Sequence, residues 1–564
     1  MRNLPKVTRK LQNCDFIFNF VEFYATKTSE SKILTLTNNN MNFGTIDIIV
    51  FVVYVIVVVG VGLWVSREKK GVKKDSKDYF LASKALPWWA VGASLIASNI
   101  SAEQFIGMSG SGFAIGMGIA SYEFMAALTL IIVAAFFLPI YLHRGIYTMP
   151  QFLEQRFDKR VKTVMAIFWL LVFVFVNLTS ILYLGALAIN TMMGVDLVWG
   201  IVGLAIFAAV YSIYGGLKAV AWTDVIQVVF LIGGGLVTTY VAFELLGDGS
   251  FGDGVKILAD KAPHKFDMIL DKAHASYSEL PGLSVLIGGL WVANLYYWGC
   301  NQYIIQRALA SKSLDEAQKG LAFAGFLKIL LPLIIVIPGI ICWVMVQEGQ
   351  IPALGKADEA YPTLLNMVPT GIKGLAFAAL VAAIVSSLAS MMNSISSIFT
   401  MDIYKSYINK GASDTHMVTV GRITSVVALI IACVVAPMLG NLDQAFQFIQ
   451  EFTGFVSPGA LAIFLAGFFY KRATANGALA AALGTFVFSV LFKFLIPGVP
   501  FMDRMMIVFA LCFLVIVLFA LLEKKPIEQA KVEYPKDLFK TSTGFKVCAV
   551  AIIAILAFLY IIWW

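Results

Sequence analysis

The sequence predicts an all-α polytopic membrane protein with about fourteen transmembrane helices. Of its 564 residues, 59% are hydrophobic and only 13% are charged, and the mean hydropathy is +0.83. A soluble globular domain carries about a quarter of its residues as charged side chains, so this composition excludes a soluble multidomain protein. Apolar runs of about 18 or more residues, each long enough to cross a bilayer, recur from Ile46 to the C-terminus.

Short polar connections separate these apolar runs and determine how many spans are expected. The spans cover 45–66, 83–112, 117–142, 161–191, 195–214, 222–247, 281–306, 318–347, 370–401, 418–438, 441–470, 473–496, 503–522 and 545–564. Every second connection is basic, namely 67–77, 143–163, 215–221, 307–319, 402–422, 471–472 and 523–546. Lys and Arg accumulate on the cytoplasmic side of a membrane. The pattern therefore predicts a multi-pass protein of the cell membrane with both termini outside.

Two segments lie apart from the spans. Residues 1–44 form a polar N-terminal extension, and Met41 stands directly before the first apolar run. The extension lacks the apolar core of a signal peptide, so we expect translation of the native protein to start at Met41. The connection 248–280 mixes Asp and Lys, and we expect a solvated loop on the outer side.

Two spans that enter the membrane from opposite sides each contain a polar break. One break is Asn99–Ser101, and the other comprises Asn294 and then Asn301–Gln302. Secondary transporters often contain two halves of opposite orientation, with discontinuous helices at matching positions. We therefore expect an inverted five-plus-five repeat core with peripheral helices. Its repeats are 83–247 and 281–470, and the peripheral helices are 45–66 and those of 473–564.

The stretch "ASNISAEQF", residues 97–105, places five polar side chains within seven positions of a span. A charged Glu at the centre of a bilayer costs about 2.5 to 3.5 kcal/mol. A lone polar residue in a span is commonly explained by bonding to a neighbouring helix, but this density, with Glu123 nearby, favours a hydrated cavity. Unwound backbone at this depth is tolerated only where it lines protein or water. Its free carbonyl groups are then available to a cation.

A second polar stripe lies in "AAIVSSLASMMNSISS", residues 382–397. Ser386 and Ser387 are adjacent, so their hydroxyls diverge by about 100° around the helix axis. Hard cations prefer oxygen ligands, so these hydroxyls with the carbonyls of a broken helix suit a weakly held monovalent ion. Ser390 and Ser397 are expected only to pack. Asp224, at the start of its span, is expected to stabilise a helix N-terminus.

Other polar residues indicate what kind of ligand the cavity holds. Lys328 lies about 12 Å from the Gly320 end of its helix, too far to reach the interface, so it requires a buried partner. The run "ANLYYWG", residues 293–299, sets an amide beside three aromatic rings in mid-span. Asn177 and Gln450 are further polar positions in apolar helices. Ring faces beside amides and carboxylates suit a neutral polyhydroxylated ligand.

Several long motifs resemble the sodium:solute symporter family, and most closely its bacterial sodium/galactose (sodium/glucose) symporters. The motifs are "GASLIASNISAEQFIGMSGSG", "IYGGLKAVAWTDVIQ", "GGLWVANLYYWGCNQYIIQR", "AAIVSSLASMMNS" and "FQFIQEFTGFVSPG", and the likeness runs from about Phe43 to the C-terminus. The resemblance implies a LeuT-like inverted-repeat fold. It also implies secondary active transport that couples inward Na⁺ flow to uptake of a neutral sugar, of galactose or glucose type, by alternating access.

The resemblance also implies roles for individual residues. The Na⁺ ligands would be the carbonyls of Ala97, Ile100 and Ala383 with the hydroxyls of Ser386 and Ser387, and Asp224 would lie on the Na⁺ exit route. Sugar hydroxyls would meet Gln104, Glu123, Asn177, Asn294, Lys328 and Gln450. Tyr297 would stack on the sugar as the inner gate, and Met108, Tyr122 and Phe446 would cap it from outside. Ala126 replaces a serine of the galactose-type pattern, which leaves the preferred epimer open.

Other functions are weighed against this one. A symporter of the same fold for sialic acid, an amino acid or a carboxylate is the main alternative, and a membrane solute sensor is another. An enzyme is not expected, because no span contains a His base. No cofactor beyond Na⁺ as the coupling ion and no nucleic acid are expected. The oligomeric state and the stoichiometry of transport stay open.

Overall fold

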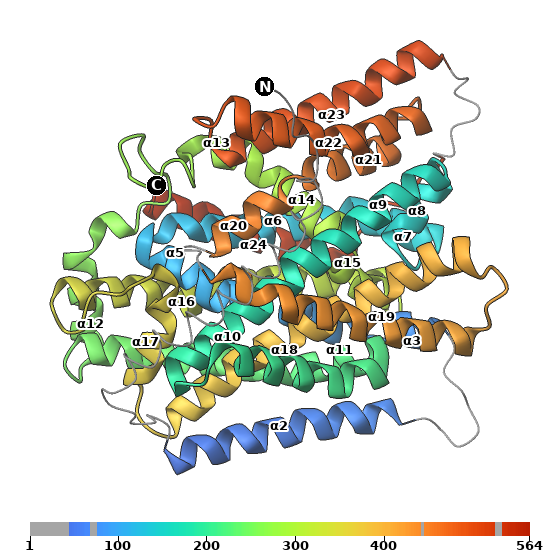
Figure 1. Ribbon diagram of the computed structural model, residues 1–564. Coiled ribbons are helices and arrows are strands. Elements are labelled where there is room, and N and C mark those ends of the chain that lie inside the picture. Colours follow the sequence, from blue (N-terminus) through green and yellow to red (C-terminus); the bar gives the residue numbers. More distant parts are fainter. Residues whose placement is uncertain (1–43, 68–75, 441–444, 525–532) are drawn as a thin grey trace, which may run out of the picture. The chain divides into compact units, whose positions relative to one another are not determined.

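A computed structural model of the chain describes residues 44–67, 76–440, 445–524 and 533–564. All of these belong to the larger of the two units into which the chain divides, Phe43–Trp564. The predicted N-terminal extension therefore lies outside the described residues except for Gly44, and so does Met41. The described part is helical, and it contains no β-strand (Figure 1).

The helices are bounded as follows. The α-helices are α2 (Thr45–Ser66), α3 (Ser76–Leu81), α4 (Trp88–Asn99), α5 (Ser109–Ala114), α6 (Ser121–Ile132), α7 (Leu138–Arg144), α8 (Met149–Arg156), α9 (Lys159–Val172), α10 (Thr179–Met193), α11 (Leu197–Leu246), α12 (Phe251–Lys261), α13 (Gly282–Ile287), α14 (Gly289–Cys300), α15 (Gln302–Leu309), α16 (Leu314–Gln347), α17 (Ala360–Met367), α18 (Ile372–Ile398), α19 (Asp414–Val435), α20 (Ala445–Thr453), α21 (Ser457–Phe469), α22 (Ala475–Leu495), α23 (Phe501–Glu523) and α24 (Thr543–Ile562). Four π-helical segments interrupt or extend them: η2 (Glu103–Met108), η4 (Val133–Phe137), η5 (Phe173–Leu178) and η8 (Phe399–Ile408). Short 3₁₀ turns are η1 (Ala82–Lys84), η3 (Met117–Ala120), η6 (Pro263–Lys265), η7 (Ala357–Glu359) and η9 (Ala436–Leu439).

Within the described ranges, eleven helical segments are long and apolar enough to cross a membrane, or twelve if α20 and α21 form one bent span. The predicted count of fourteen is not confirmed. Of the two remaining predicted spans, 83–112 is divided into shorter pieces, and 195–214 corresponds to a shorter apolar helix, Leu197–Val210. The multi-span helical architecture itself agrees with the prediction.

The first predicted broken helix is observed. α4 ends at Asn99, where Ile100 takes an extended conformation with φ −76° and ψ 112°. The chain then resumes as η2 and α5. Because the predicted span began at residue 83 and α4 begins only at Trp88, the start of this span was placed too early.

The second predicted break is also present, at one of its two expected positions. α14 ends at Cys300, Asn301 is extended with φ −88° and ψ 125°, and α15 follows. A break at Asn294 was wrong, because the helix is continuous there. Its side-chain amide donates to the carbonyl of Leu290 at 3.1 Å, one helical turn earlier, so Asn294 finds a partner without unwinding the backbone.

Two predicted spans, 195–214 and 222–247, both lie in α11, which consists of two helices that meet at a kink. The kink is at Gly216, whose φ of 65° and ψ of −163° are not helical, so the chain turns within the predicted basic connection 215–221. A glycine is required here, because a side chain disfavours this conformation. An added Cβ would also lie 2.6 Å from the carbonyl oxygen of Tyr79.

The connection 248–280 is more structured than predicted. It contains α12 and η6, and Lys265 and Met268 are buried. The amine of Lys265 donates to the carbonyls of Phe113 at 3.0 Å and Ala114 at 2.8 Å, at the end of α5. This segment therefore packs over the α5 end of the first broken helix, and the expectation of a solvated loop was wrong for these residues.

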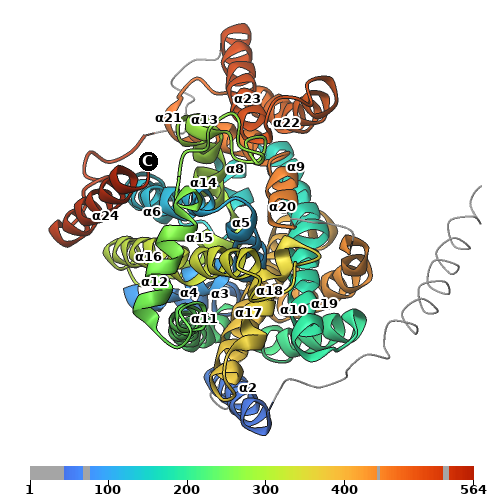
Figure 2. The same ribbon diagram turned by 90° about the vertical axis from the view of Figure 1, so that its left-hand side faces the viewer.

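The spans differ sharply in how much of each is buried by the others. In Ile372–Ile408, 94% of the most apolar window is buried, against 17% in Thr45–Val65 and in Thr543–Ile562. Figure 2 accordingly shows α18 among the other helices, with α2, α24 and the α22–α23 pair on the outside. Apolar side chains left exposed on such outer helices suit contact with lipid.

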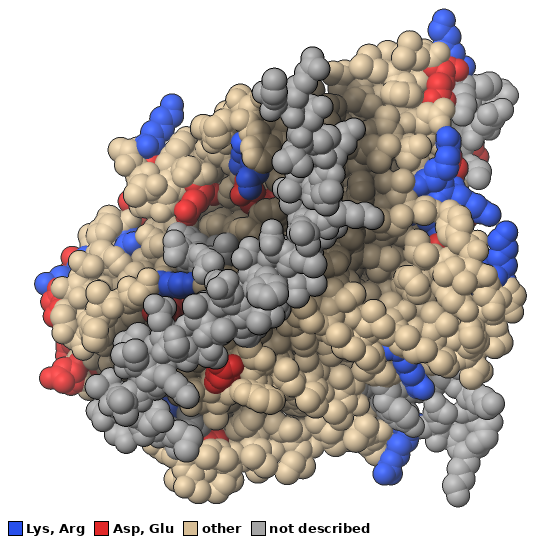
Figure 3. Space-filling model, in the orientation of Figure 1, with Lys and Arg blue, Asp and Glu red and all other residues tan. Residues whose placement is uncertain are grey.

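Charged side chains are distributed unevenly between the two ends of the bundle. On the face drawn in Figure 3, Lys and Arg gather at the right-hand edge, while the left-hand edge mixes both signs. The left-hand edge in the same orientation carries α12, and the right-hand edge carries the end of α8 (Figure 1). We call the right-hand edge the basic end of the bundle.

Candidate functional site

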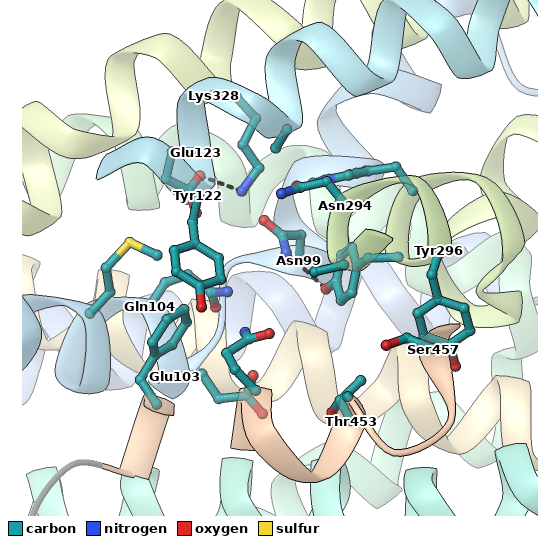
Figure 4. A pocket seen from close by; sticks show the side chains of 18 of the residues that line it. Asn99, Glu103, Gln104, Tyr122, Glu123, Asn294, Tyr296, Lys328, Thr453 and Ser457 are labelled. Atoms are coloured by element: carbon teal, nitrogen blue, oxygen red, sulfur yellow. Dashed lines mark hydrogen bonds and ion pairs between the residues drawn. The ribbon is translucent and has the colours of Figure 1, made fainter. Parts of the chain in front are cut away.

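A polar cavity lies inside the bundle, beside the first broken helix (Figure 4). Side chains from η2, α6, α14, α16, α20 and α21 converge on it. Its lining includes Asn99, Glu103, Gln104, Met108, Tyr122, Glu123, Ala126, Asn294, Tyr296, Tyr297, Trp298, Lys328, Phe446, Gln450, Thr453 and Ser457. The cavity measures about 50 Å³, whereas pockets that hold drug-sized ligands measure about 300 to 1,000 Å³. Its walls must therefore separate before a solute of sugar size can enter.

An ion pair between Lys328 and Glu123 lies on one wall of the cavity (Figure 4). The side chain of Lys328 is 1% exposed and that of Glu123 is 4% exposed. The lysine amine also lies 5.1 Å from the centre of the Trp298 ring. The sequence predicted that a lysine in mid-helix needs a buried partner, and Glu123 is that partner. The pair carries no net charge while it still presents polar atoms to the cavity.

Tyr297, which also lines the cavity, joins the two broken helices. The side-chain amide of Asn99, the last residue of α4, donates to the phenol oxygen of Tyr297 at 2.8 Å. The same phenol is hydrogen-bonded to the hydroxyl of Tyr303, in α15 beyond the second break. One side chain therefore connects the end of α4 with both parts of the second broken helix.

Aromatic side chains close another part of the wall. The rings of Tyr122 and Phe446 meet edge to face, with their centres 5.3 Å apart. Gly107 allows this contact, because a Cβ there would lie 2.9 Å from the Cβ of Phe446. Met108 lines the cavity beside them. The three predicted outer-gate residues are thus close together on one side.

Two further polar residues of η2 line the cavity, and they differ in how well their side chains are hydrogen-bonded. The side-chain oxygen of Gln104 accepts from the backbone N–H of Ser101 at 2.9 Å and therefore helps to hold the break in place. Glu103 is buried, and one of its carboxyl oxygens has no hydrogen-bond partner among the described residues. An unpaired buried carboxyl group is costly, so a hydrogen-bond donor that reached Glu103 would stabilise this wall.

The break in the first helix leaves backbone carbonyls that a serine of α18 contacts. The hydroxyl of Ser387 donates to the carbonyls of Ser98 at 3.0 Å and Ile100 at 3.1 Å, and it lies 3.5 Å from that of Ala97. Ser387 is fully buried. The predicted juxtaposition of this hydroxyl with the broken helix is therefore present, with the carbonyl of Ser98 added to those expected.

Ser386 points elsewhere, as expected for the neighbour of Ser387 on a helix. Its hydroxyl donates to a carboxyl oxygen of Asp224 at 2.6 Å, and the hydroxyl of Ser94 donates to the other oxygen at 2.6 Å. Asp224 is fully buried within α11, so a role at a helix N-terminus was wrong. Ser390 does more than pack, since it is hydrogen-bonded to Ser98 at 2.9 Å and to the guanidinium of Arg307.

The structure gathers most of the predicted solute-binding and gate residues around this cavity. Asn177 is the exception: it lies buried in η5 and is not among the lining residues. Reasoning from sequence missed Tyr296, Trp298, Thr453 and Ser457, and it indicated Glu103 only as part of the polar stretch 97–105. The run "ANLYYWG" contained a signal for Tyr296 and Trp298. Thr453 and Ser457 gave none, because they reach the cavity only through the 47° bend between α20 and α21.

A helical membrane protein with two broken helices that meet beside a small polar cavity has the architecture of a secondary transporter. Comparison with known proteins agrees with this class. The chain belongs to the sodium:solute symporter family, whose model matches residues 79–484. The predicted membership is thereby confirmed.

Individual relatives and structures support this membership. The chain is 54% identical to the sodium/glucose cotransporter of Vibrio parahaemolyticus over 518 residues, which cover 89% of this chain and 95% of the relative. It is 34% identical to the sodium/myo-inositol cotransporter 2 of Mus musculus, over 75% of this chain and 66% of the relative. Its fold is similar to that of a substrate-bound, outward-open Na⁺-coupled sialic acid symporter, with a TM-score of 0.75, 25% identity, and coverage of 85% of this chain and 98% of the other. These similarities confirm the predicted LeuT-like fold.

Proposed function

We propose that the protein couples the inward flow of Na⁺ to the uptake of a neutral sugar, of glucose or galactose type, by alternating access. One observation carries this proposal: the hydroxyl of Ser387 lies on the carbonyls of a broken helix whose next turns line a small polar cavity. An ion bound at the break can thereby determine the shape of the cavity. The family and the sodium/glucose cotransporter relative support the choice of Na⁺ and sugar.

The proposed Na⁺ site comprises the carbonyls of Ala97, Ile100 and Ala383 and the hydroxyls of Ser386 and Ser387. The hydroxyl of Ser387 already faces Ile100 and Ala97. A cation there would take over the carbonyl oxygens, and the serine would turn its lone pairs toward the ion. Asp224 would receive the ion on its way out, since Ser386 links the two positions by a 2.6 Å hydrogen bond.

The proposed sugar site comprises Gln104, Glu123, Asn177, Asn294, Tyr297, Lys328 and Gln450. All of these except Asn177 line the cavity. Because Lys328 and Glu123 neutralise each other, the site has no surplus cationic group for an acidic solute. A neutral sugar can exchange hydrogen bonds with both members of the pair. Asn177 would reach the sugar only after the cavity widens.

The gates follow from the same geometry. Tyr297 would be the inner gate, because its hydrogen bonds to Asn99 and Tyr303 must break before it can move. Met108, Tyr122 and Phe446 would be the outer gate. With the basic connections placed in the cytoplasm, Tyr297 faces the inner side and both termini lie outside the cell membrane.

The energy of one Na⁺ suffices for this task. Moving one charge across 100 mV yields about 2.3 kcal/mol, and a tenfold concentration gradient adds about 1.4 kcal/mol. One Na⁺ for each sugar would therefore sustain an accumulation of roughly 500-fold, at about 1.36 kcal/mol for each factor of ten.

Uptake by proteoliposomes tests the proposal. The full chain is reconstituted and supplied with labelled glucose, galactose, myo-inositol or sialic acid, with and without an inward Na⁺ gradient. We expect saturable, Na⁺-dependent uptake of a neutral hexose and little uptake of the acidic sugar. Uptake of sialic acid in preference to the hexoses would reject the sugar assignment. Hexose uptake that an inward K⁺ gradient supports equally well would reject Na⁺ coupling.

A further inference from the structure

A second cavity, of about 470 Å³, lies between α8, α9 and η8 at the basic end of the bundle. It is separate from the polar cavity of the proposed sugar site, and no residue lines both. Its lining includes Lys159, Lys162, Lys405 and Lys410, with Glu154 as its one acidic residue. We call this space the lysine cavity.

Lys162 pairs with the two acidic residues nearest to it, Glu154 and Asp402. It is buried, and its amine lies 2.7 Å from a carboxyl oxygen of Glu154 and 3.5 Å from one of Asp402. The same amine donates to the hydroxyl of Ser406 at 3.0 Å. Glu154 and Asp402 are therefore both engaged by a single lysine. Asp158, which directly precedes Lys159, is paired with Arg160, with 2.7 Å between its carboxyl oxygen and the guanidinium nitrogen.

Three cations then remain without an acidic partner. Within the described part of the chain, Lys159, Lys405 and Lys410 form no ion pair. They come from two segments that are far apart in the sequence but share one hollow. The positive-inside rule explains basic residues in loops, but it does not require lysines from separate loops to converge. Like charges held together are unfavourable unless an anion offsets them.

The edge of the lysine cavity has the character of a membrane boundary. Directly after Ser406, the side chains of Tyr407 and Ile408 are 55% and 63% exposed. Exposed aromatic and apolar residues beside lysines are typical of the depth at which lipid headgroups lie. Gln151 and Gln155 add neutral hydrogen-bond donors to the lining.

We propose that the lysine cavity binds a phosphate group, carried either by an anionic lipid or by a soluble phosphorylated solute. Three unpaired ammonium groups with neutral donors match the charge and the oxygen acceptors of a phosphate. Basic pockets between membrane helices on the cytoplasmic side bind phospholipid headgroups by the same chemistry. The ligand would join η8, which continues α18, to α8 and α9. Since α18 carries Ser386 and Ser387, binding there would act on the helix of the proposed ion site.

Two triple variants test this site. The first changes Lys159, Lys405 and Lys410 to Gln. The matched control makes the same change at Lys218, Lys312 and Lys471, which are exposed lysines outside the cavity. Each protein is placed in nanodiscs of neutral phosphatidylcholine, alone or with phosphatidic acid, and retained lipid is counted by native mass spectrometry. A second measurement tests soluble ligands: the unfolding temperature of each protein in neutral nanodiscs is compared with and without glucose 6-phosphate or inorganic phosphate.

We expect the unmodified protein and the control to bind a phosphate-bearing probe, and the cavity variant to lose about fivefold in affinity for each lysine removed. Retention of phosphatidic acid alone identifies a lipid headgroup, and a shift with glucose 6-phosphate identifies a soluble source. Equal binding by the two variants would show general surface charge and overturn the proposal. The absence of binding by the unmodified protein in both arms would overturn it as well. Size-exclusion profiles check that all three proteins are folded.

Discussion

The side-chain amide of Asn99 donates to the phenol oxygen of Tyr297 at 2.8 Å, and this bond joins the two broken helices. Asn99 is the last helical residue before the first break, and Tyr297 lies one turn before the second. A shift of either break must therefore stretch or break this bond. The bond offers a route by which a change at the proposed ion site on the first helix could alter the proposed gate on the second.

Removing the hydroxyl of Tyr297 should weaken the inner gate. Tyr297→Phe keeps the ring but loses the bonds to Asn99 and Tyr303, each worth about 1 kcal/mol. We expect labelled sugar to leave preloaded proteoliposomes at least roughly fivefold faster in the absence of Na⁺. Tyr54→Phe, which removes a buried phenol from the outer helix α2, is the control. Unchanged efflux from the Tyr297 variant would argue against the gate.

Ser387→Ala should affect the ion rather than the sugar. The change removes the hydroxyl that contacts the free carbonyls of Ser98 and Ile100. Loss of one oxygen ligand should raise the Na⁺ concentration for half-maximal uptake by about tenfold, or 1.4 kcal/mol, with the preference among sugars retained. Ser397→Ala, in the same helix, removes a hydroxyl that donates to the backbone of Ser394. An unchanged Na⁺ activation curve for Ser387→Ala would contradict the proposed site.

Breaking the Lys328–Glu123 pair should destabilise the protein. Removal of one partner leaves a buried charge uncompensated, at a cost of about 3 to 5 kcal/mol. Lys328→Met and Glu123→Gln should therefore each lower the midpoint of thermal unfolding. The double variant should recover much of the loss while it still fails to transport sugar. Additive losses in the double variant would show that the two side chains do not act as a pair.

Glu451 should position the outer half of the bent span. Its carboxyl oxygens lie 2.8 Å from the guanidinium of Arg504 and 3.2 Å from the amine of Lys493, on α23 and α22. The adjacent Gln450 lines the cavity. We expect Glu451→Gln to raise the KM for sugar several-fold with little change in Na⁺ activation. Asp537→Asn removes an exposed ion pair with Lys540 and should leave both quantities unchanged.

Lys265 should make the free energy of unfolding depend on pH in the alkaline range. Burial lowers the pKa of its amine from 10.5 to about 8. Between these two values the unfolded chain binds more protons than the folded one, so the free energy of unfolding rises with pH. We expect the unfolding midpoint of the native protein to rise across this window relative to that of Lys265→Met. Parallel pH profiles for the two proteins would show that Lys265 does not titrate there.

Polar residues in apolar spans carried most of the predictive information. They indicated the break at Asn99, the buried partner of Lys328, and the juxtaposition of Ser387 with free carbonyls. Each is a place where a lone polar group would be too costly, so the fold must provide a partner. The same argument failed at Asn294, because an amide can satisfy itself on its own helix.

Other features depend on tertiary geometry that a single sequence does not contain. The non-helical conformation of Gly216 divides α11 into two helices, and the second of them places Asp224 among serine hydroxyls. The 47° bend after Thr453 brings that residue into the cavity. The predicted number of spans is not confirmed for a similar reason, because broken and short helices do not match a fixed length of apolar sequence.

The close approach of Gly216 to the backbone of Tyr79 has a practical consequence for anyone engineering this protein. Because even a Cβ atom there would lie 2.6 Å from the carbonyl oxygen of Tyr79, a residue inserted at this kink would have to displace its neighbours. Epitope tags, reporter fusions and split-protein junctions belong elsewhere, although residues 215–221 look in sequence like a convenient surface loop.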